Sequence, residues 1–231
     1  MAELSRKSIT DAVVDYFREK IQSGELGPGD KLPSERSLMQ QLGVSRFSLR
    51  EGLARLSALG IITIRQGKGA FICEDVKAQT LRDVLLPLLS NTNAHRFNEL
   101  IEARILLETA LAQKAALIRR EEDLVKLRKN LEATAAALDD AERFAVLDFE
   151  FHQIIARIAK NEFLFRMQEV LHGAVEEFIH ENVRQASSRH DALADHRLIV
   201  AAVEKQSPEE VELQMRKHIH VCVKHYQDLR G

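Results

Sequence analysis

The chain has 231 residues, of which 45% are apolar and 29% are charged, and its formal net charge is −2. This composition is typical of a globular protein, and the length suffices for one large domain or two ordinary ones. The longest apolar run, VLLPLL, is far too short to cross a bilayer, and two cysteines are too few for a disulfide framework. We therefore expect a cytoplasmic protein that is neither secreted nor membrane-bound.

Charge and histidine are distributed unevenly along the chain, which indicates two modules. Residues 1–73 carry a net charge of +3, whereas the remainder carries −5, and all nine histidines lie after residue 94. We expect a first domain over 1–74, a polar linker over 75–80 and a second domain over 81–231. The basic character of the first module is compatible with nucleic-acid binding but is too weak to establish it.

The first domain begins with three predicted helices. Residues 8–23 place apolar side chains at helical spacing, and the turn formers of GELGPGD end this helix. A short second helix begins after Ser34, which is placed as its N-cap, and a tight connection at Gly43 follows it. Ser45 is placed to cap a third helix, whose leucines point inward and which Gly60 ends.

After the third helix, the apolar period changes from that of a helix to that of a strand. IITI and AFI are short runs rich in β-forming residues, and the turn RQGKG joins them. This pattern predicts a two-stranded hairpin with a basic, glycine-containing tip. Three helices followed by such a hairpin describe a winged helix-turn-helix.

The second helix of a helix-turn-helix motif presents its N-terminal residues to base edges in the major groove of double-stranded DNA. An arginine there can donate two hydrogen bonds to a guanine or make a strong contact to a phosphate. The alternative is a solvated basic face on a winged helix that docks protein, but arginines at three suitable turns favour DNA. The residues predicted to contact DNA are Arg36, Ser45, Arg46, Phe47, Ser48, Arg50, Gly67 and Lys68.

The first domain resembles the DNA-binding domain of the GntR family of bacterial transcription regulators. The resemblance is carried by PGDKLPSER, SR..LRE.L..L and G.G.F. It implies that operator DNA is contacted by Arg36, Arg46 and Arg50, with Ser45, Ser48 and Gly67 nearby. One departure concerns Phe47 and Ser48, which stand where the family usually has Thr followed by Pro or Thr. Phe47 could meet a thymine methyl group, so the base preference is expected to differ from that of relatives.

The second domain is predicted to be entirely helical, because no segment of it alternates like a strand. Polar and turn-forming stretches divide it into about seven helical segments. These are 78–90, 94–118, 121–139, 141–160, 162–183, 190–206 and 208–229. The expected fold class is therefore mostly α, with the winged helix-turn-helix followed by an all-α antiparallel bundle of six to seven helices.

Four potential metal ligands occupy core-facing positions on three of these segments. Asp148 and His152 lie four residues apart within an apolar stripe, so both can converge on one ion. His196 and His218 lie in the apolar stripes of the last two segments. Any one of these histidines could simply be buried and hydrogen-bonded, and Asp148 and His152 could form an ion pair. A divalent cation would compensate all four, and the donor set suits Zn, Ni, Fe, Co or Mn.

A further polar pair, Arg104 and Glu108, faces inward from the segment 94–118. An internal salt bridge would satisfy both side chains. The functional alternative is that Arg104 clamps a carboxylate or phosphate ligand, which the forked guanidinium fits.

The other histidines of the second domain are expected to lie outside this site. His172, Glu176 and His180 fall off the apolar stripe of the segment 162–183, which favours a solvated face. His220 is expected to point away from the core. His225 lies in the last turn of its helix, where it is expected to face the carbonyl end.

The second domain resembles the FCD-type effector domain of a large GntR subfamily, through EARILLE, LDFEFHQIIARIAKN, DHRLIVAAVE and MRKHI. The resemblance makes Arg104, beside Glu108, a contact to an organic-acid effector that lies next to a metal. The resemblance also implies that the metal ligands are Asp148, His152, His196 and His218. Some members of the wider subfamily lack these ligands and bind acyl-CoA, so the full set here argues against that effector.

These patterns together predict a metabolite-responsive transcription regulator, more often a repressor in this family. It would form a homodimer, bind a short inverted-repeat operator, and respond to a small carboxylate that shifts its DNA-binding domains. The rival hypothesis is a metal-dependent, hydrolase-like enzyme with a DNA-binding tail, since open positions on such a metal can activate water. No nucleophile motif is present and no carboxylate is obviously placed as general base, which favours the regulator over the enzyme.

Overall fold

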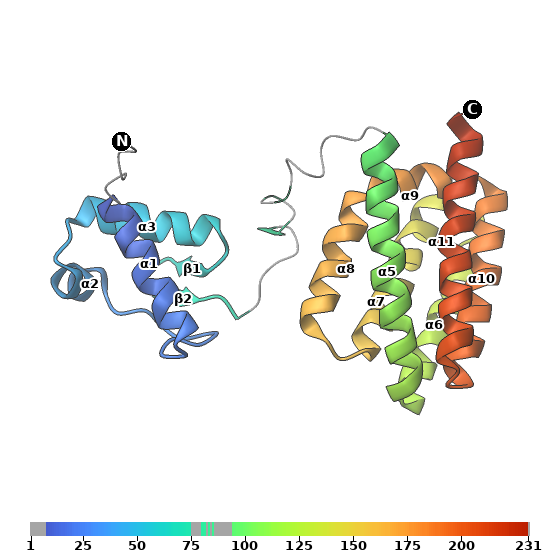
Figure 1. The fold of residues 1–231 in the computed structure, drawn as a ribbon, viewed down its shortest axis with the longest axis horizontal. Coiled ribbons are helices and arrows are strands. Elements are labelled where there is room, and N and C mark those ends of the chain that lie inside the picture. The colour runs from blue at the N-terminus through green and yellow to red at the C-terminus, as the bar shows by residue number, and fades with distance from the viewer. Residues whose placement is uncertain (1–7, 75–79, 82, 84, 86–93, 231) are drawn as a thin grey trace, which may run out of the picture. The chain divides into compact units, whose positions relative to one another are not determined.

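The computed structural model describes residues 8–74, 80, 81, 83, 85 and 94–230 (Figure 1). The chain divides into two compact units, one up to Val84 and the other from Leu85. The linker expected over 75–80 and the helix expected over 78–90 lie largely outside the described residues. No helix in the described parts of the chain is long and apolar enough to cross a membrane.

The first unit is a winged helix-turn-helix, which confirms the predicted fold. Its elements are α1 (Ile9–Gln22), α2 (Glu35–Leu42), α3 (Arg46–Ala58), β1 (Ile62–Arg65) and β2 (Gly69–Ile72). A capping box begins α1, because the Ser8 hydroxyl accepts from the backbone N–H of Asp11 and the Asp11 carboxylate accepts from that of Ser8. The two strands are antiparallel and pair Ile62 with Ile72.

The close approach of α1 to α3 fixes the position of the third helix. A Cβ atom added at Gly52 would lie 2.6 Å from Cγ1 of Val13, so only glycine allows the two helices to pack this tightly. Phe17, Leu49 and Leu56 fill the core beside this contact. The buried face of α3 is thereby held inside the unit, and its N-terminal residues are left on the surface.

The second unit is an all-α bundle, as the sequence predicts. Figure 1 shows α5 and α11 running alongside each other as two long helices of the bundle. The helices are α5 (Ala94–Ile118), α6 (Glu121–Ala136), α7 (Ala141–Ile158), α8 (Glu162–Ala174), α9 (Glu176–Val183), α10 (Ala186–Glu204) and α11 (Pro208–Arg230). Buried apolar side chains from all of these helices except α8 form one core, and Leu171 and Ala174 of α8 pack against it. Phe165 of α8 also packs against α5 and α7.

Two predicted boundaries are wrong. The segment 162–183 is not one helix, because the backbone leaves helical geometry at Val175 and divides it into α8 and α9. The helix expected to begin at residue 190 begins at Ala186 instead. Buried Arg189 donates hydrogen bonds to the carbonyls of Val183 and Arg184, at 2.6 and 2.9 Å. These bonds tie the first turn of α10 to the end of α9, so the break is confined to Arg184 and Gln185 and the rest of QASS is helical.

Candidate metal centre and DNA-binding surface

Three helices bring the four predicted metal ligands together inside the bundle. Asp148 and His152 lie one turn apart on α7, His196 lies on α10 and His218 on α11. All four side chains are buried, and one ligand atom from each lies within 4.8 Å of the others. The helical stripes that suggested this convergence therefore meet at one point in the fold.

The geometry of this cluster fits a metal ion. Oδ1 of Asp148 lies 3.4 Å from Nε2 of His196, which is roughly the 3.4 Å spacing of neighbouring ligands in a tetrahedral site. Phe151 stacks on the His196 ring with centroids 3.8 Å apart and fixes its orientation. Both ring nitrogens of His196 and Nδ1 of His218 are buried without a hydrogen-bond partner among the described residues. Buried nitrogens in this state are costly unless a ligand such as a metal binds them.

Glu108 links this cluster to Arg104. Its Oε1 accepts from Nε of Arg104 at 2.7 Å, and its Oε2 lies 2.6 Å from Nδ1 of His152. The salt bridge considered from the sequence is thus present, with both side chains buried. A carboxylate at Nδ1 holds the ring so that Nε2 is available to a metal, which is a common arrangement for metal-binding histidines. Nη2 of Arg104 lies 3.5 Å from that Nε2.

Burial and neighbouring charges set the protonation of these groups. Burial alone would raise the pKa of Glu108, but Arg104 and His152 outweigh it and hold that pKa below its ordinary value. Burial lowers the pKa of His196 and His218 well below the ordinary histidine value, and the neighbouring imidazole of His152 adds to the effect. Both rings are therefore neutral, which is the form that binds a metal. Burial also raises the pKa of Asp148 in the absence of an ion.

The expectation of a solvated face on α8 is wrong for His172. This ring is buried and stacks on Phe149 with centroids 3.9 Å apart, and burial is the main cause of a pKa lowered to about 3. Glu176 is exposed and His180 is half-buried, as a surface position requires. The error follows from treating 162–183 as one helix, because the break at Val175 rotates the stripe of α8 away from that of α9.

Two histidines of α11, His220 and His225, lie outside the cluster. His220 is exposed, as predicted, and its Nδ1 lies 2.8 Å from the carbonyl oxygen of Arg216. His225 does not face the carbonyl end of its helix, because its Nε2 lies 2.9 Å from Oδ2 of Asp191 on α10. This contact joins α10 and α11 near the bundle surface.

Gln168 is a buried polar residue that the sequence analysis missed. Its side chain is 1% exposed, and neither its amide nitrogen nor its amide oxygen has a hydrogen-bond partner within the described parts of the chain. Together with Glu108 and His152 it borders a narrow internal gap. Apolar side chains of Leu111, Ile155, Ala156 and Met215 line the rest of the gap, which is too narrow to admit a water molecule.

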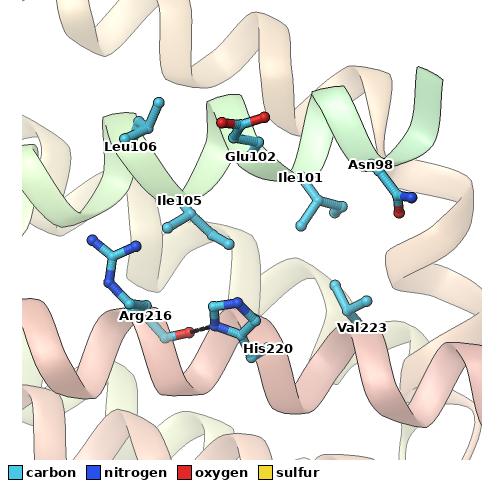
Figure 2. Close-up of a pocket in the computed structure, with 8 residues that line it drawn as sticks. All are labelled: Asn98, Ile101, Glu102, Ile105, Leu106, Arg216, His220 and Val223. Atoms are coloured by element: carbon cyan, nitrogen blue, oxygen red, sulfur yellow. Dashed lines mark hydrogen bonds between the residues drawn. The ribbon is translucent and has the colours of Figure 1, made fainter. Parts of the chain in front are cut away.

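A second hollow lies on the bundle surface between α5 and α11. Figure 2 shows its two walls, with Ile101 and Ile105 on α5 pointing toward His220 and Val223 on α11. The groove measures about 390 Å³ and contains none of the four clustered ligands. The internal cluster is therefore the better candidate for metal and effector chemistry.

The exposed side of the winged helix carries the residues predicted to contact DNA. The hydroxyl of Ser45 accepts from the backbone N–H of Ser48 and begins α3, which leaves Phe47 78% exposed. Arg46 and Arg50 are also exposed, and their Nε atoms lie 3.5 and 3.2 Å from the carboxylate of Glu35 on α2. The two arginines are therefore grouped at one end of the helix.

The other predicted contacts lie on α2 and on the wing. Arg36 is exposed in the first turn of α2. Gly67 adopts a φ of 71° at the tip of the β1–β2 hairpin, a conformation that favours glycine, and exposed Lys68 follows it. Each predicted DNA contact is thus on the surface, apart from half-buried Ser48.

Family models match both units of the chain. The model for bacterial regulatory proteins of the gntR family matches residues 9–72, and the model for the FCD domain matches residues 99–221. The chain belongs to the GntR family, with an FCD effector domain. Because both halves match, the family covers the winged helix and the bundle that holds the cluster.

Relatives of this GntR-family protein are transcription regulators. An uncharacterised HTH-type transcriptional regulator of Bacillus subtilis, YcbG, is 31% identical over 94% of this chain and 89% of its own. The HTH-type transcriptional repressor NanR of Escherichia coli is 27% identical over 94% of this chain and 84% of its own. The structure of a Streptococcus agalactiae GntR aligns with a TM-score of 0.67 and 27% identity, and covers 93% of this chain and 98% of that one.

The GntR-family chain is therefore a DNA-binding transcription regulator. It is not an enzyme, and the hydrolase alternative is not favoured, because the relatives that match both halves are regulators.

Proposed function

We propose that this regulator is a repressor whose binding to operator DNA responds to a small carboxylate effector held at a divalent metal in the bundle. The observation that carries the proposal is the set of four buried ligand atoms within 4.8 Å of one another, with orphaned imidazole nitrogens among them. A regulator that holds a metal in its effector domain has a direct way to bind an anionic metabolite. One relative is named a transcriptional repressor, which supports repression and not activation.

The metal would be held by Asp148, His152, His196 and His218, and Zn, Ni, Fe, Co and Mn all suit these donors. When bound, the ion supplies a Lewis-acidic position for a carboxylate oxygen. Arg104 places a second cationic group beside His152, which would add a charge-assisted hydrogen bond. Glu108 keeps both Arg104 and the His152 ring in position.

The winged helix would read the operator through the N-terminus of α3. Arg46 and Arg50 are exposed there and can reach base edges or phosphates, with Arg36 and the wing residue Lys68 contacting the backbone. Phe47 is exposed between polar neighbours, where a thymine methyl group would cover its ring. A homodimer in the cytoplasm would present two such surfaces to an inverted repeat.

Coupling between the two units requires the effector to bind one arrangement of the dimer more tightly than another. The carboxylate would bridge α7, α10 and α11 through the metal and α5 through Arg104. A ligand that contacts four helices at once changes how they pack. A repressor would then release its operator when the effector is present.

Arg46→Ala is expected to weaken operator binding by about 10- to 100-fold, since one good arginine contact to a base or phosphate contributes about 1–3 kcal/mol. The measurement is fluorescence anisotropy with an inverted-repeat duplex that the wild-type protein has selected from a randomised pool. Arg197→Ala, which removes an exposed arginine of α10, is the matched control and should bind normally. Wild-type affinity in Arg46→Ala, with an unchanged circular dichroism spectrum, would contradict the DNA-contacting role of α3.

The effector proposal is tested by thermal melting of the full chain against a panel of small organic acids, before and after chelation. An acid present at about 100 times its Kd should stabilise the protein by about 2.7 kcal/mol, which raises Tm by several degrees. We expect at least one acid to raise Tm in the metal-loaded protein and to have no effect after chelation. Stabilisation by metal with no response to any acid would indicate a purely structural ion.

A further inference from the structure

Gln168 lies beside Glu108 and His152, and its side chain has no hydrogen-bond partner among the described residues. Its side chain is 1% exposed on the buried face of α8, and both polar atoms of the amide lack partners among the residues that the structure describes. The gap beside it admits no water molecule, so an ordered water does not satisfy the amide in this conformation. A buried amide in this state costs stability unless something else bonds to it.

The same gap places Gln168 beside one of the four clustered residues, His152. Glu108 from α5 and the metal ligand His152 from α7 line it together with Gln168 from α8. The other lining residues, Leu111, Ile155, Ala156 and Met215, offer no hydrogen-bonding side chain apart from the weak acceptor sulfur of methionine. Within the gap, Gln168 is therefore the neutral group that can both donate and accept a hydrogen bond. A ligand that widened the gap from the metal side would meet this amide.

The charges around the gap define the ligand further. The Arg104 guanidinium and the Glu108 carboxylate lie 2.7 Å apart, and their opposite charges cancel, so the pair carries no net charge. Asp148 contributes one negative charge as a metal ligand, and the three imidazole ligands are neutral. Asp195, 3.9 Å from Nδ1 of His218, is paired with Lys217 at 3.2 Å, so a divalent ion leaves one net positive charge among these groups. One carboxylate neutralises it, whereas a second carboxylate would be buried without a partner.

We propose that Gln168 determines the specificity of the effector site and selects a small monocarboxylate that carries a hydroxyl group. The hydroxyl donates to the amide oxygen and accepts from the amide nitrogen of Gln168, while the carboxylate lies at the metal. This inference rests on the proposed function, because it assumes that an organic acid binds beside the ion. A site built to bond a hydroxyl rejects the analogue that lacks it, since the amide is then left unpaired.

The test measures binding to zinc-loaded full-length protein by calorimetry. The probes are three matched pairs of acids, glycolate with acetate, lactate with propionate and gluconate with hexanoate, together with the dianion malate. In at least one pair, the hydroxy acid should bind about 100-fold or more tightly than its partner. In Gln168→Leu this preference should shrink by at least about 10-fold, with unchanged zinc affinity and little change for the acid without a hydroxyl. The control is Gln113→Leu. It removes a side-chain amide of α5 that donates to Glu212 of α11, and it should keep the wild-type preference.

A second measurement separates a specificity role from a structural one. Without effector, Gln168→Leu should melt at or above the wild-type temperature, because it removes two unpaired polar groups from the interior. If Gln168→Leu does not fold, Gln168→Met is used in its place, and the same changes in preference and melting temperature are expected.

Each other outcome contradicts a defined part of the proposal. Acids that bind with the wild-type preference in Gln168→Leu would overturn the role of Gln168 and leave the proposed function intact. A lower melting temperature or an altered zinc affinity in that variant would likewise show that the residue supports the fold or the metal site. Tighter binding of malate than of every monoanion would overturn the assignment of charge. If no acid binds the zinc-loaded wild type, the proposed effector function fails, and this inference fails with it.

Discussion

His196→Ala should abolish tight metal binding by the bundle. His196 is fully buried, stacked on Phe151, and 3.4 Å from the carboxylate of Asp148, so no other side chain can take its place without repacking α10. Loss of a residue that only supports a ligand typically lowers metal affinity by about 10- to 100-fold, so loss of a ligand should lower it by at least about 100-fold. Competition with a chromophoric chelator measures this affinity directly.

The stability of the variant provides a second readout. Zinc at about 100 times its Kd should stabilise the wild type by about 2.7 kcal/mol relative to the chelated protein, and this difference should vanish in His196→Ala. The difference between loaded and chelated protein is the quantity to compare, because the alanine also removes packing against Phe151. His220→Ala, which alters an exposed histidine of α11, is the control and should bind zinc normally. Tight zinc binding by His196→Ala would show that the four residues do not form the site.

Arg104→Met is expected to have the largest effect on stability in the absence of metal. The guanidinium and the Glu108 carboxylate are both buried and joined at 2.7 Å, so the methionine variant leaves a carboxylate in the interior with only His152 beside it. Breaking a buried pair from one side costs about 3–5 kcal/mol. Urea unfolding of the chelated protein measures this loss.

The double variant Arg104→Met/Glu108→Leu separates the cost of an unpaired charge from the contribution of the pair itself. Replacing both members of a buried pair by apolar side chains is often neutral or even stabilising by about 1–4 kcal/mol. We therefore expect the double variant to regain most of the loss, although Nδ1 of His152 then lacks its carboxylate. The double variant should also respond poorly to organic acids, because Arg104 is absent. A double variant as unstable as Arg104→Met alone would mean that packing around the guanidinium, and not its charge, dominates.

The local patterns of the sequence determine much of this protein. Capping serines, turn glycines and the change of period after Gly60 are sufficient to predict the winged helix. The spacing of Asp148 and His152 within one apolar stripe, and the core-facing positions of His196 and His218, predict that these four side chains converge, as they do in the bundle, whereas their binding of a metal stays a prediction. These inferences succeed because helical period and capping depend on residues a few positions apart.

Contacts between helices were decided only by the tertiary structure. The 2.6 Å contact of Glu108 with His152 joins α5 to α7, and no pattern within either helix specifies it. Gln168 and His172 are buried on α8, which ends before Val175, and no proline marks that break. Periodicity identifies the side of a helix that is buried, but the neighbour that covers it is chosen by the packing of the whole bundle. The residues that position the proposed metal ligands and line the proposed effector site are therefore evident only once the helices are packed together.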